Sequence, residues 1–352
     1  MRAIIFLAIP CLLGLNFIAS ADSLPPGCEY DKECVVELPG SLCGDGSPSY
    51  FSLVAKRNSP DLLLYLEPGG ACWSAETCVF PHVTKLSRKP PTTKLIREKG
   101  LLNLSDPTNP FYKFSKVTIP YCTGDVFLGD SEPNYGDAAH PNIVHHHGYQ
   151  NALLTMEAVK NYFPEPERVV LFGRSAGGLG VLAQLRNLDS IFPHAMKYGL
   201  ADSGTPLMPP FVDETNYSKI IDAWNAYATL PAVVSSDKMS NFGDLLRFNT
   251  LHFPHIRYGL IQSYDDRVMT YFAKSIGTSD SSQAVRKSIL VASNEDIGLE
   301  TPHAKVFYIK SKDHVLTRKA VSQIKSSGMR LSEWLHLMFS QERWPNIRPD
   351  LD

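Results

Sequence analysis

The chain has 352 residues, of which 43% are hydrophobic and 20% are charged, and its formal net charge at pH 7 is −2. This length and composition fit one large globular domain with a substantial core. Because acidic and basic residues are interspersed and nearly balanced, the composition does not favour a nucleic-acid-binding protein or a polybasic membrane-surface protein.

The first residues have the features of an export signal. A basic start at residues 1–2 precedes an apolar run over 3–19, and residues 19–21 form a small-x-small cleavage pattern. We expect a signal peptide over residues 1–21 and a secreted (in a bacterium, periplasmic) single domain over 22–352. The alternative is an uncleaved membrane anchor, which the shortness of the run disfavours. No later stretch is apolar enough to span a membrane.

Cysteines dominate the start of the mature chain. An even number in an exported protein predicts disulfides, here among Cys28, Cys34, Cys43, Cys72, Cys78 and Cys122. Cys72 with Cys78 is the most local expected pair, and the other pairings stay open. No Cys-x-x-Cys pair is present, which disfavours a metal site. Residues 22–49, rich in Cys, Gly and Pro, predict an irregular N-terminal cap.

Two early strands lead to a glycine-rich loop. Residues 50–55 alternate like a strand, and residues 61–66 form a continuous apolar run typical of a central strand. The loop over 67–73 follows at once, and its glycines let the backbone approach a ligand closely. Further along, Asn103 and Asn216 begin N-x-Ser patterns, which predict glycosylation if the source is eukaryotic.

The middle of the chain carries a strand, a loop and three adjacent histidines. Residues 116–121 predict a strand, and the loop over 122–130 is expected to border a site. Residues 145–147 are all histidine and precede a predicted helix over 149–162. We predict no metal there, because adjacent residues do not converge on one ion and no carboxylate lies at helical spacing to them. One of these histidines could still form a hydrogen bond in a site.

The residues from 167 to 179 have the pattern of a catalytic turn. A short apolar strand over 169–172 is followed by Gly-x-Ser-x-Gly at 173–177 and by a predicted helix over 179–188. Strand, tight turn and helix together are typical of the nucleophile elbow of α/β-hydrolases. Because the turn is tight, a side chain larger than glycine at either end of the motif would strike the strand or the helix. The alternative is an ordinary glycine-rich turn.

The elbow gives the earlier glycine-rich loop a predicted role. In such hydrolases the residue after the nucleophile and a loop after an upstream strand donate N–H groups to the oxyanion. We therefore expect an oxyanion hole made by Gly70, Ala71 and Ala176 around Ser175. The alternative for the loop is a simple turn held by its cysteine.

Beyond the elbow, the chain predicts an insertion and a closing helix. A strand over 198–201 precedes a segment over 205–253 with helical stretches near 217–228 and 240–248. The segment is interpreted as a lid over an acyl site, with plain surface helices as the alternative. Residues 331–339 predict an amphipathic closing helix.

Two late strands each end at a residue with catalytic chemistry. Residues 257–262 are followed by Asp265, and residues 305–309 by His314. The carboxyl ends of parallel strands are the edge of a sheet at which ligands bind. The chain order Ser, Asp, His is that of α/β-hydrolases.

These motifs resemble the pectin acetylesterase/Notum family of serine esterases. The likeness covers about residues 50–339 and is carried by Leu66-Glu67-Pro68-Gly69-Gly70-Ala71-Cys72 with Cys78, Asn109-Pro110-Phe111, Pro120-Tyr121-Cys122-Thr123-Gly124-Asp125-Val126, Gly173-Arg174-Ser175-Ala176-Gly177-Gly178, Ala201-Asp202-Ser203-Gly204, Tyr264-Asp265 and Asp313-His314. The resemblance implies an α/β-hydrolase fold, with a mostly parallel central sheet flanked by helices, together with export and hydrolysis of acyl esters on sugars or protein serine. It places the catalytic triad on Ser175, Asp265 and His314. Asp266, the next residue along the chain, is the rival for the acid role.

The sequence departs from the family in two places that flank the expected acyl site. Ala71 stands where the family usually has tryptophan, with Trp73 just beyond, and Arg174 stands where cysteine or serine is commoner. We expect Trp73, Asp125 and Arg174 to contact substrate. These departures indicate a divergent branch whose substrate does not follow from the resemblance.

The predicted function is hydrolysis of acetyl or longer acyl esters of a carbohydrate or another alcohol, through an acyl-enzyme on Ser175. This chemistry needs no cofactor or metal. One alternative is a serine peptidase or thioesterase on the same fold, because a triad does not specify the bond. Another is a non-catalytic binding protein, which is disfavoured because the triad residues and both elbow glycines are all present.

Overall fold

The computed structural model describes residues 24–79, 84–87, 99–230, 242–292, 303–340 and 343–350. The expected signal peptide over residues 1–21 lies outside these ranges. Within them, no helix combines the length and the apolar character needed to cross a bilayer.

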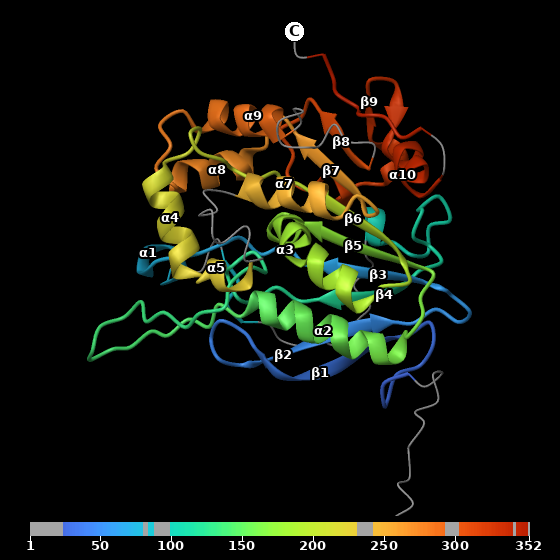
Figure 1. Cartoon of the computed structure of the whole chain (residues 1–352), viewed down its shortest axis with the longest axis horizontal. Helices are drawn as coiled ribbons and strands as arrows, with labels where there is room; N and C mark the ends of the chain where they lie inside the picture. The colour runs from blue at the N-terminus through green and yellow to red at the C-terminus, as the bar shows by residue number, and fades with distance from the viewer. Residues whose placement is uncertain are drawn as a thin grey trace, which may run out of the picture.

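An eight-stranded sheet forms the centre of the protein, in the order β1-β2-β4-β3-β5-β6-β7-β8 (Figure 1). The strands are β1 (Glu33–Leu42), β2 (Pro48–Val54), β3 (Asp61–Leu66), β4 (Ser115–Ile119), β5 (Arg168–Arg174), β6 (Met196–Asp202), β7 (Arg257–Ser263) and β8 (Ala304–Ile309). The pairs β1–β2 and β2–β4 are antiparallel, and every pair from β4 to β8 is parallel. This mostly parallel sheet, flanked by helices, is the predicted α/β-hydrolase fold.

The strand β3 shows why the sheet is central. All six of its residues are buried. Leu62, Leu64 and Leu66 pack into one hydrophobic core, and Leu63 and Tyr65 pack into another. Successive side chains of a strand point to opposite faces, so a run of apolar residues is what a strand covered on both faces requires.

Helices cover both faces of the sheet. They are α1 (Ala75–Val79), α2 (Gly148–Tyr162), α3 (Ala176–Ile191), α4 (Glu214–Ala223), α5 (Ala226–Thr229), α7 (Phe242–His252), α8 (Arg267–Ser275), α9 (Ser281–Ala292) and α10 (Leu331–Phe339). Short 3-10 turns lie at Gly100–Leu102, Leu316–Arg318 and Val321–Gln323, and a small hairpin is formed by β9 (Lys325–Ser326) and β10 (Met329–Arg330).

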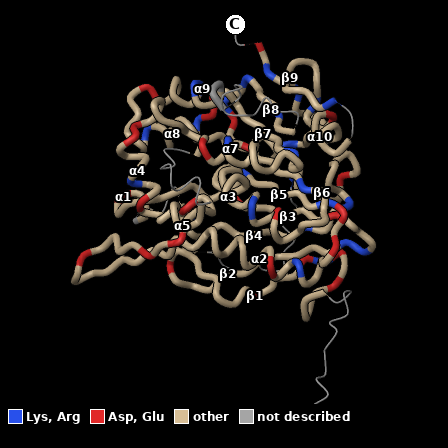
Figure 2. The backbone as a smooth tube through the Cα atoms, in the orientation of Figure 1, with Lys and Arg blue, Asp and Glu red and all other residues tan. Residues whose placement is uncertain are grey.

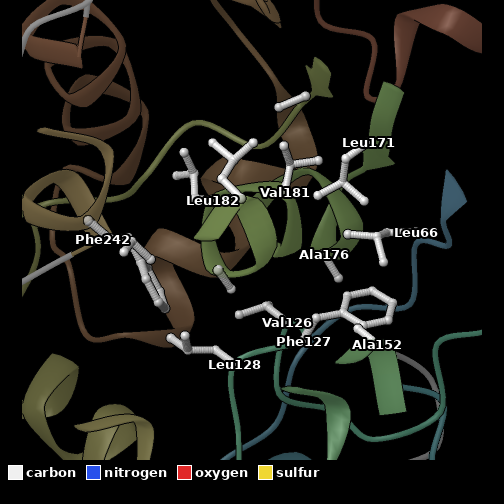
Figure 3. Close-up of a cluster of buried hydrophobic side chains, with 14 of the residues drawn as sticks. Leu66, Val126, Phe127, Leu128, Ala152, Leu171, Ala176, Val181, Leu182 and Phe242 are labelled. Atoms are coloured by element: carbon white, nitrogen blue, oxygen red, sulfur yellow. The ribbon is translucent and has the colours of Figure 1, made fainter. Parts of the chain in front are cut away.

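The two cores assign these helices to opposite faces. Apolar residues of α2 and α3 pack with the core that contains Leu64, whereas Trp334 and Leu335 of α10 belong to the other core. Figure 3 shows α3 at the middle of the first core, with Val181 and Leu182 among apolar side chains from several elements. The helix that follows the elbow is therefore held firmly against the sheet.

The N-terminal segment is more regular than its composition predicts. Residues 22–49 were expected to be an irregular cap, but Glu33–Leu42 forms β1, which pairs with β2 at the edge of the sheet. The expectation of irregular structure there is wrong because exposed and covered side chains alternate along much of this edge strand. The segment is also tied by disulfides from Cys28 to Cys34 and from Cys43 to Cys122.

Most of the other predicted elements are confirmed. The expected strands after residue 50 correspond to β2–β8, and the expected helices correspond to α2, α3, α4 with α5, α7 and α10. The insertion over 205–253 is helical where it is described, while residues 231–241 lie outside the described ranges. Helices α8 and α9 were not predicted. Figure 2 shows acidic and basic residues interspersed over the molecule, as the composition indicates.

Candidate active site

Ser175 lies in a tight turn between β5 and α3. Its φ of 53° and ψ of −119° are unusual for a residue other than glycine. The Ser175 N–H donates to the carbonyl of Asp202 at 2.8 Å, and the serine carbonyl accepts from Gly178 at 2.8 Å. The turn is thus held by backbone bonds while the side chain stands at the N-terminus of α3. This is the strained strand–turn–helix geometry that the sequence predicts for a nucleophile elbow.

The two glycines of the motif are required by space. A Cβ atom at Gly173 would overlap the carbonyl of Gly177, and a Cβ at Gly177 would overlap the carbonyl of Leu66 on β3. Backbone atoms cannot move aside as flexible side chains do. The strand, the elbow and the neighbouring strand therefore pack closer than any larger residue would allow, which confirms the steric prediction.

His314 follows β8 and is paired with a buried carboxylate. Its Nδ1 atom lies 2.8 Å from Oδ2 and 3.0 Å from Oδ1 of Asp266. Asp266 has no exposed surface, and its Oδ1 also accepts from the N–H groups of Val268 and Met269 at the start of α8. The carboxylate is fixed from both sides, so it holds the imidazole ring in one orientation.

The expected partner of His314, Asp265, points elsewhere. Its Oδ1 accepts from Nε of Arg286 at 2.7 Å on the protein surface, and its backbone N–H bonds to the Ser311 carbonyl. The prediction that Asp265 orients the histidine is therefore wrong, and Asp266, the rival, takes that position. The reason is local: Asp266 is the N-cap of α8, and capping turns its side chain inward.

Ser175 and His314 line the same pocket at the edge of the sheet. The other ring nitrogen of His314, Nε2, is buried and has no hydrogen-bond partner among the described residues. No hydrogen bond therefore joins it to Ser175 in this structure. Such contacts between nucleophile and base are often long without substrate. The structure brings the predicted hydroxyl and imidazole to one pocket, with the carboxylate behind the imidazole.

The loop that follows His314 is held by two buried side chains of opposite charge, Asp202 and Arg174. The carboxylate of Asp202 accepts from the N–H groups of Leu316 and Thr317 at 3.1 and 2.7 Å. Arg174 donates from Nε to the Thr317 hydroxyl at 2.9 Å and from Nη2 to the Thr317 carbonyl at 2.7 Å. Two side chains at the ends of β5 and β6 thus set the position of the histidine loop.

Arg174 was predicted to contact substrate, and its position corrects this expectation. The guanidinium is buried, lies over the rings of Tyr65 and Phe172, and binds Thr317. It reaches the loop from the core side of the sheet. This loop anchor could not be predicted from local sequence, because the partner lies 143 residues further along the chain.

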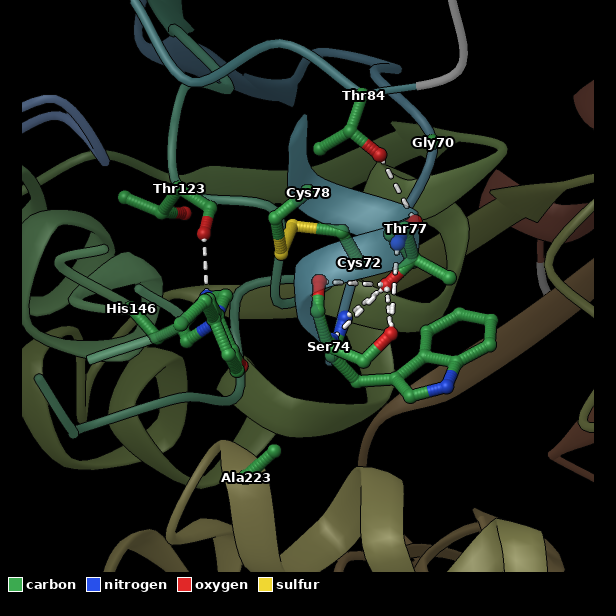
Figure 4. The surroundings of a disulfide bond; sticks show 12 residues. Gly70, Cys72, Ser74, Thr77, Cys78, Thr84, Thr123, His146 and Ala223 are labelled. Carbon is green, nitrogen blue, oxygen red and sulfur yellow. Dashed lines mark hydrogen bonds between the residues drawn. A yellow bond between two sulfur atoms is a disulfide. The ribbon is translucent and has the colours of Figure 1, made fainter. Parts of the chain in front are cut away.

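The glycine-rich loop after β3 is held rigidly beside Ser175. A disulfide joins Cys72 to Cys78, as predicted, and Thr84 donates to the Ala71 carbonyl at 2.8 Å (Figure 4). The hydroxyl of Tyr121 donates to the Gly70 carbonyl at 2.8 Å. These bonds occupy carbonyl oxygens of the loop and so fix the direction of its peptide groups.

An apolar cavity opens beside the nucleophile. It has a volume of about 70 Å³ and contains the predicted oxyanion residues Gly70, Ala71 and Ala176 in its wall, next to Ser175. The remaining wall is almost entirely apolar and consists of Trp73, Val126, Leu179, Ser203, Leu207, Tyr217, Ile220, Trp224, Phe242, Met269, Phe272 and Ile276. Trp73 thus lies in the wall of the cavity beside Ser175, a position that agrees with its predicted contact with substrate. Several of these side chains come from the helical insertion, which covers the cavity.

A wider pocket that contains basic side chains is also lined by the serine. Its volume is about 540 Å³, and it is shared by Ser175 and His314. Three basic side chains, Lys85, Arg267 and Arg318, are among its lining residues. Ser175 thus lines both a small apolar cavity and a larger pocket that contains basic side chains.

Asp125 does not reach either pocket, which corrects its predicted contact with substrate. Its carboxylate is fully buried and accepts from the Thr123 hydroxyl at 2.6 Å and from the N–H of Gly148 at 2.6 Å, at the start of α2. Burial raises the pKa of Asp125 to about 6, although these hydrogen bonds act in the opposite direction. Asp125 joins the loop after β4 to α2.

His146, the middle histidine of the run, is also structural. Its Nδ1 lies 2.7 Å from the Thr123 carbonyl beside the disulfide (Figure 4), so this nitrogen carries the proton. Its Nε2 lies 3.0 Å from the Tyr135 hydroxyl, which donates to it. Burial lowers the pKa of His146 to about 4, so the ring is neutral at pH 7.

The two predicted glycosylation sites differ in their surroundings. Asn103 lies at the end of a 3-10 turn and its Oδ1 accepts from the Ser105 N–H at 3.2 Å. Asn216 lies in α4, and its Nδ2 donates to the Ile276 carbonyl at 3.1 Å. Glycosylation of either residue stays a prediction, and Asn216 would first have to release this bond.

Comparisons with known proteins find relatives of this chain. The human palmitoleoyl-protein carboxylesterase NOTUM is 31% identical over 189 residues, which is 50% of this chain and 35% of that protein. Pectin acetylesterase 4 of Arabidopsis thaliana is 29% identical over 184 residues, which is 48% of this chain and 42% of that protein. Pectin acetylesterase 11 of the same plant is 25% identical over 206 residues, which is 56% and 52% of the two chains. The matches therefore span only about a third to a half of these relatives.

A family model described as pectinacetylesterase matches residues 31–242, more than half of the chain. The matched region runs from β1 through the glycine-rich loop and the elbow to the insertion helices. With the resemblance expected from the sequence, the strand order and the elbow geometry, this match shows that the chain belongs to the pectinacetylesterase family.

Proposed function

We propose that the protein is a secreted serine esterase in which Ser175 is the nucleophile, His314 the general base and Asp266 the residue that orients the histidine. One observation carries this proposal. His314 directs Nδ1 to a buried carboxylate, and it shares with the elbow serine a pocket in which its Nε2 atom has no partner among the described residues. A base held in this way can take a proton from a hydroxyl.

The reaction follows from the positions of these groups. Ser175 Oγ attacks the ester carbonyl while its proton passes to Nε2 of His314, and Asp266 stabilises the imidazolium that forms. The tetrahedral intermediate collapses, the carbon–oxygen bond to the alcohol breaks, and the imidazolium returns its proton to the leaving alkoxide. Water then attacks the acyl-serine with the same histidine as base, which releases the acid and restores the hydroxyl.

The oxyanion in each step would be bound by backbone donors. Gly70, Ala71 and Ala176 all line the cavity beside Ser175, and Ala176 is the first residue of α3. A helix N-terminus favours negative charge, and N–H groups fixed before the reaction need no reorganisation when that charge develops. The disulfide and hydrogen bonds of the Gly70 loop supply that rigidity.

The small apolar cavity supports a short acyl chain. Its volume of about 70 Å³ is smaller than the cavity of about 150 Å³ that takes benzene in an engineered protein. An acetyl to butyryl group suits this space, whereas a long lipid chain does not. In this respect the chain is closer to what the name pectin acetylesterase describes than to a palmitoleoyl-protein carboxylesterase.

The basic pocket supports an alcohol that carries negative charge. Lys85, Arg267 and Arg318 line the side of Ser175 where the leaving alcohol would lie. A neighbouring pocket that shares Arg267 adds Lys274 and Lys312 to this lining, while its Arg286 is paired with Asp265. An acylated acidic carbohydrate, such as the pectin in the relatives' name, fits this charge.

Export is part of the proposal and rests on the N-terminal sequence and the disulfides. The expected signal peptide precedes a domain with three disulfide bonds, which persist in oxidising compartments.

A series of p-nitrophenyl esters from acetate to palmitate tests both parts of the proposal. We expect turnover with a burst, the highest kcat/KM between acetate and butyrate, and a loss of roughly a million-fold in Ser175→Ala. A preference for octanoate or longer esters would contradict the short acyl site but not the catalytic residues. Hydrolysis that survives Ser175→Ala would contradict the nucleophile itself.

A further inference from the structure

A two-stranded ribbon precedes α2 and stands apart from the catalytic pockets. In Figure 1 it is the long green excursion that projects beside α5. Backbone bridges pair Ser131 with His146 and Asn134 with Ile143 in antiparallel register. The Ser131 and His146 backbones exchange hydrogen bonds of 3.1 and 2.8 Å. The same register sets Glu132 opposite His145, and Asp130 opposite His147.

Strand alternation sorts the three histidines onto two faces. His146 points inward to the Thr123 carbonyl, so its neighbours His145 and His147 share the outer face. Glu132 and Asp130 stand across the ribbon on that same face. His145 and His147 are two residues apart rather than adjacent, so the extended backbone places both rings together, with centroids 5.9 Å apart. Two imidazoles on one strand thus face two carboxylates on the other.

The donor atoms of three of these residues converge. Glu132 Oε1 lies 3.0 Å from Nδ1 of His145 and 2.9 Å from Nε2 of His147. One ligand atom of each residue lies within 4.8 Å of the other two. Both histidine side chains are 22% exposed, and that of Glu132 is 51% exposed, so solvent reaches the cluster.

We propose that Glu132, His145 and His147 form a binding site for a divalent transition-metal ion of the zinc class. Imidazole and carboxylate are ligands that zinc accepts in tetrahedral sites, with a water in the fourth position. This site is independent of the proposed esterase chemistry and uses none of its residues.

The carboxylate oxygen already stands near the distance from both nitrogens that coordination requires. With metal–ligand bonds of about 2.1 Å, tetrahedral donor atoms stand about 3.4 Å apart. The two nitrogen–oxygen pairs stand at 3.0 and 2.9 Å, so an opening of a few tenths of an ångström replaces both hydrogen bonds by coordination. Asp130 completes the arrangement, because its Oδ1 lies 3.3 Å from Nδ1 of His147. When Nε2 binds metal, Nδ1 carries the proton and donates to that carboxylate, which orients the ring.

The ribbon is also where the helical insertion attaches. The Asp130 N–H donates to the Trp224 carbonyl at 2.9 Å, and the Ser131 hydroxyl donates to the Ala223 carbonyl at 2.6 Å. Trp224 in turn lines the apolar cavity. An ion that joins the two strands would therefore stabilise the ribbon to which Trp224 of the cavity wall is bonded. Its role is structural.

Calorimetric titration of the tag-free, chelator-treated protein with zinc chloride tests the site. We expect one ion per chain, and binding weakened at least ~100-fold in His145→Gln/His147→Gln and ~10- to 100-fold in Asp130→Asn. The control is His255→Gln, because His255 pairs with Asp189 at 2.7 Å on the surface and belongs to no such cluster among the described residues. This variant should bind zinc like the wild type.

A second measurement separates this site from scattered surface binding. Cobalt(II) added to the wild type should give the intense visible absorption of a four-coordinate site, and zinc should raise the Tm of the wild type but not of the double variant. The variants replace partly exposed groups, and their metal-free Tm values show whether they fold. Equal zinc affinity in the wild type and the double variant, or an equal loss in His255→Gln, would overturn the proposal.

Discussion

The exchange of Asp266 for asparagine tests which carboxylate serves the histidine. The Oδ1 atom of Asp266 accepts from two N–H groups at the start of α8, whereas Oδ2 lies nearest to His314 Nδ1. In Asp266→Asn the remaining oxygen keeps the two helix donors, so the new NH₂ group takes the Oδ2 position. It then donates to Nδ1, which forces the ring proton onto Nε2. That is the nitrogen that must accept the proton of Ser175.

The expected loss follows from this wrong tautomer. In the serine-protease triad the same exchange reduces kcat by ~10⁴-fold, which corresponds to about 5.5 kcal/mol of transition-state stabilisation. The helix cap is kept, but the NH₂ group faces Nε2 of Gln262, which donates to Oδ2 at 3.1 Å in the wild type, so stability should fall by about 1–3 kcal/mol. Asp265→Asn is the matched control, because it removes only a surface ion pair with Arg286, worth about 0–1 kcal/mol. Its kcat should stay within about twofold of the wild type.

The assay is the steady-state hydrolysis of p-nitrophenyl acetate by both variants, with thermal unfolding to confirm the fold. We expect KM to change much less than kcat in Asp266→Asn, because the carboxylate is behind the imidazole and away from substrate. A variant Asp265→Asn that loses activity while Asp266→Asn keeps a tenth or more of it would refute the assignment.

Three further changes have predicted outcomes. The pKa of His146 is about 4 in the folded protein and about 6.5 in the unfolded chain, so its contribution to the free energy of unfolding is complete above pH 6.5 and falls by about 3 kcal/mol as the pH falls to 4. The destabilisation caused by His146→Asn, measured by urea unfolding, should therefore shrink by that amount over this pH range. A destabilisation that does not depend on pH would contradict this expectation. Asp202→Asn places an NH₂ group against N–H donors of the loop that carries His314. It should therefore lower the free energy of unfolding by about 1–3 kcal/mol and also lower kcat. An unchanged kcat would show that the loop does not need this anchor. Ile220→Phe narrows the apolar cavity and should reduce kcat/KM for the butyrate ester more than for the acetate ester. The control Leu251→Phe, at an exposed position of α7, should leave both kcat/KM values unchanged. Equal losses of kcat/KM for the two esters in Ile220→Phe would count against the cavity as the acyl site.

The sequence predicted the sheet and the elbow because both depend on local patterns. Residues 62–66 are all apolar, as a doubly covered strand requires, and the predicted strand over 61–66 matches β3 from end to end. The elbow glycines are needed by contacts with backbone a few residues away or on the adjacent strand. Such constraints leave a strong pattern in a single sequence.

The acid of the site was harder to predict because its role depends on an element that the sequence did not reveal. Helix α8 was missed, and with it the N-cap that turns Asp266 inward and leaves Asp265 at the surface. The apolar positions of α8 at Val268, Met269 and Phe272 have helical spacing. A predicted helix from Arg267 would have favoured the residue before it.

Long-range contacts account for the other corrections. Arg174 and Asp125 are polar residues next to catalytic motifs, and their sequence context favoured substrate contact. The structure gives each a buried partner, Thr317 for the arginine and the start of α2 for the aspartate. The ribbon face of His145, His147 and Glu132 depends on a strand register that adjacent histidines do not indicate.

Covalent labelling of the nucleophile tests the central claim most directly. A fluorophosphonate ester should react once per chain, and mass spectrometry of the digested protein should locate the adduct on Ser175. The reaction should be absent in Ser175→Ala and strongly slowed in His314→Ala, since the hydroxyl needs that base. Hydrolysis of an acetate ester by a chain whose Ser175 stays unlabelled would contradict the account.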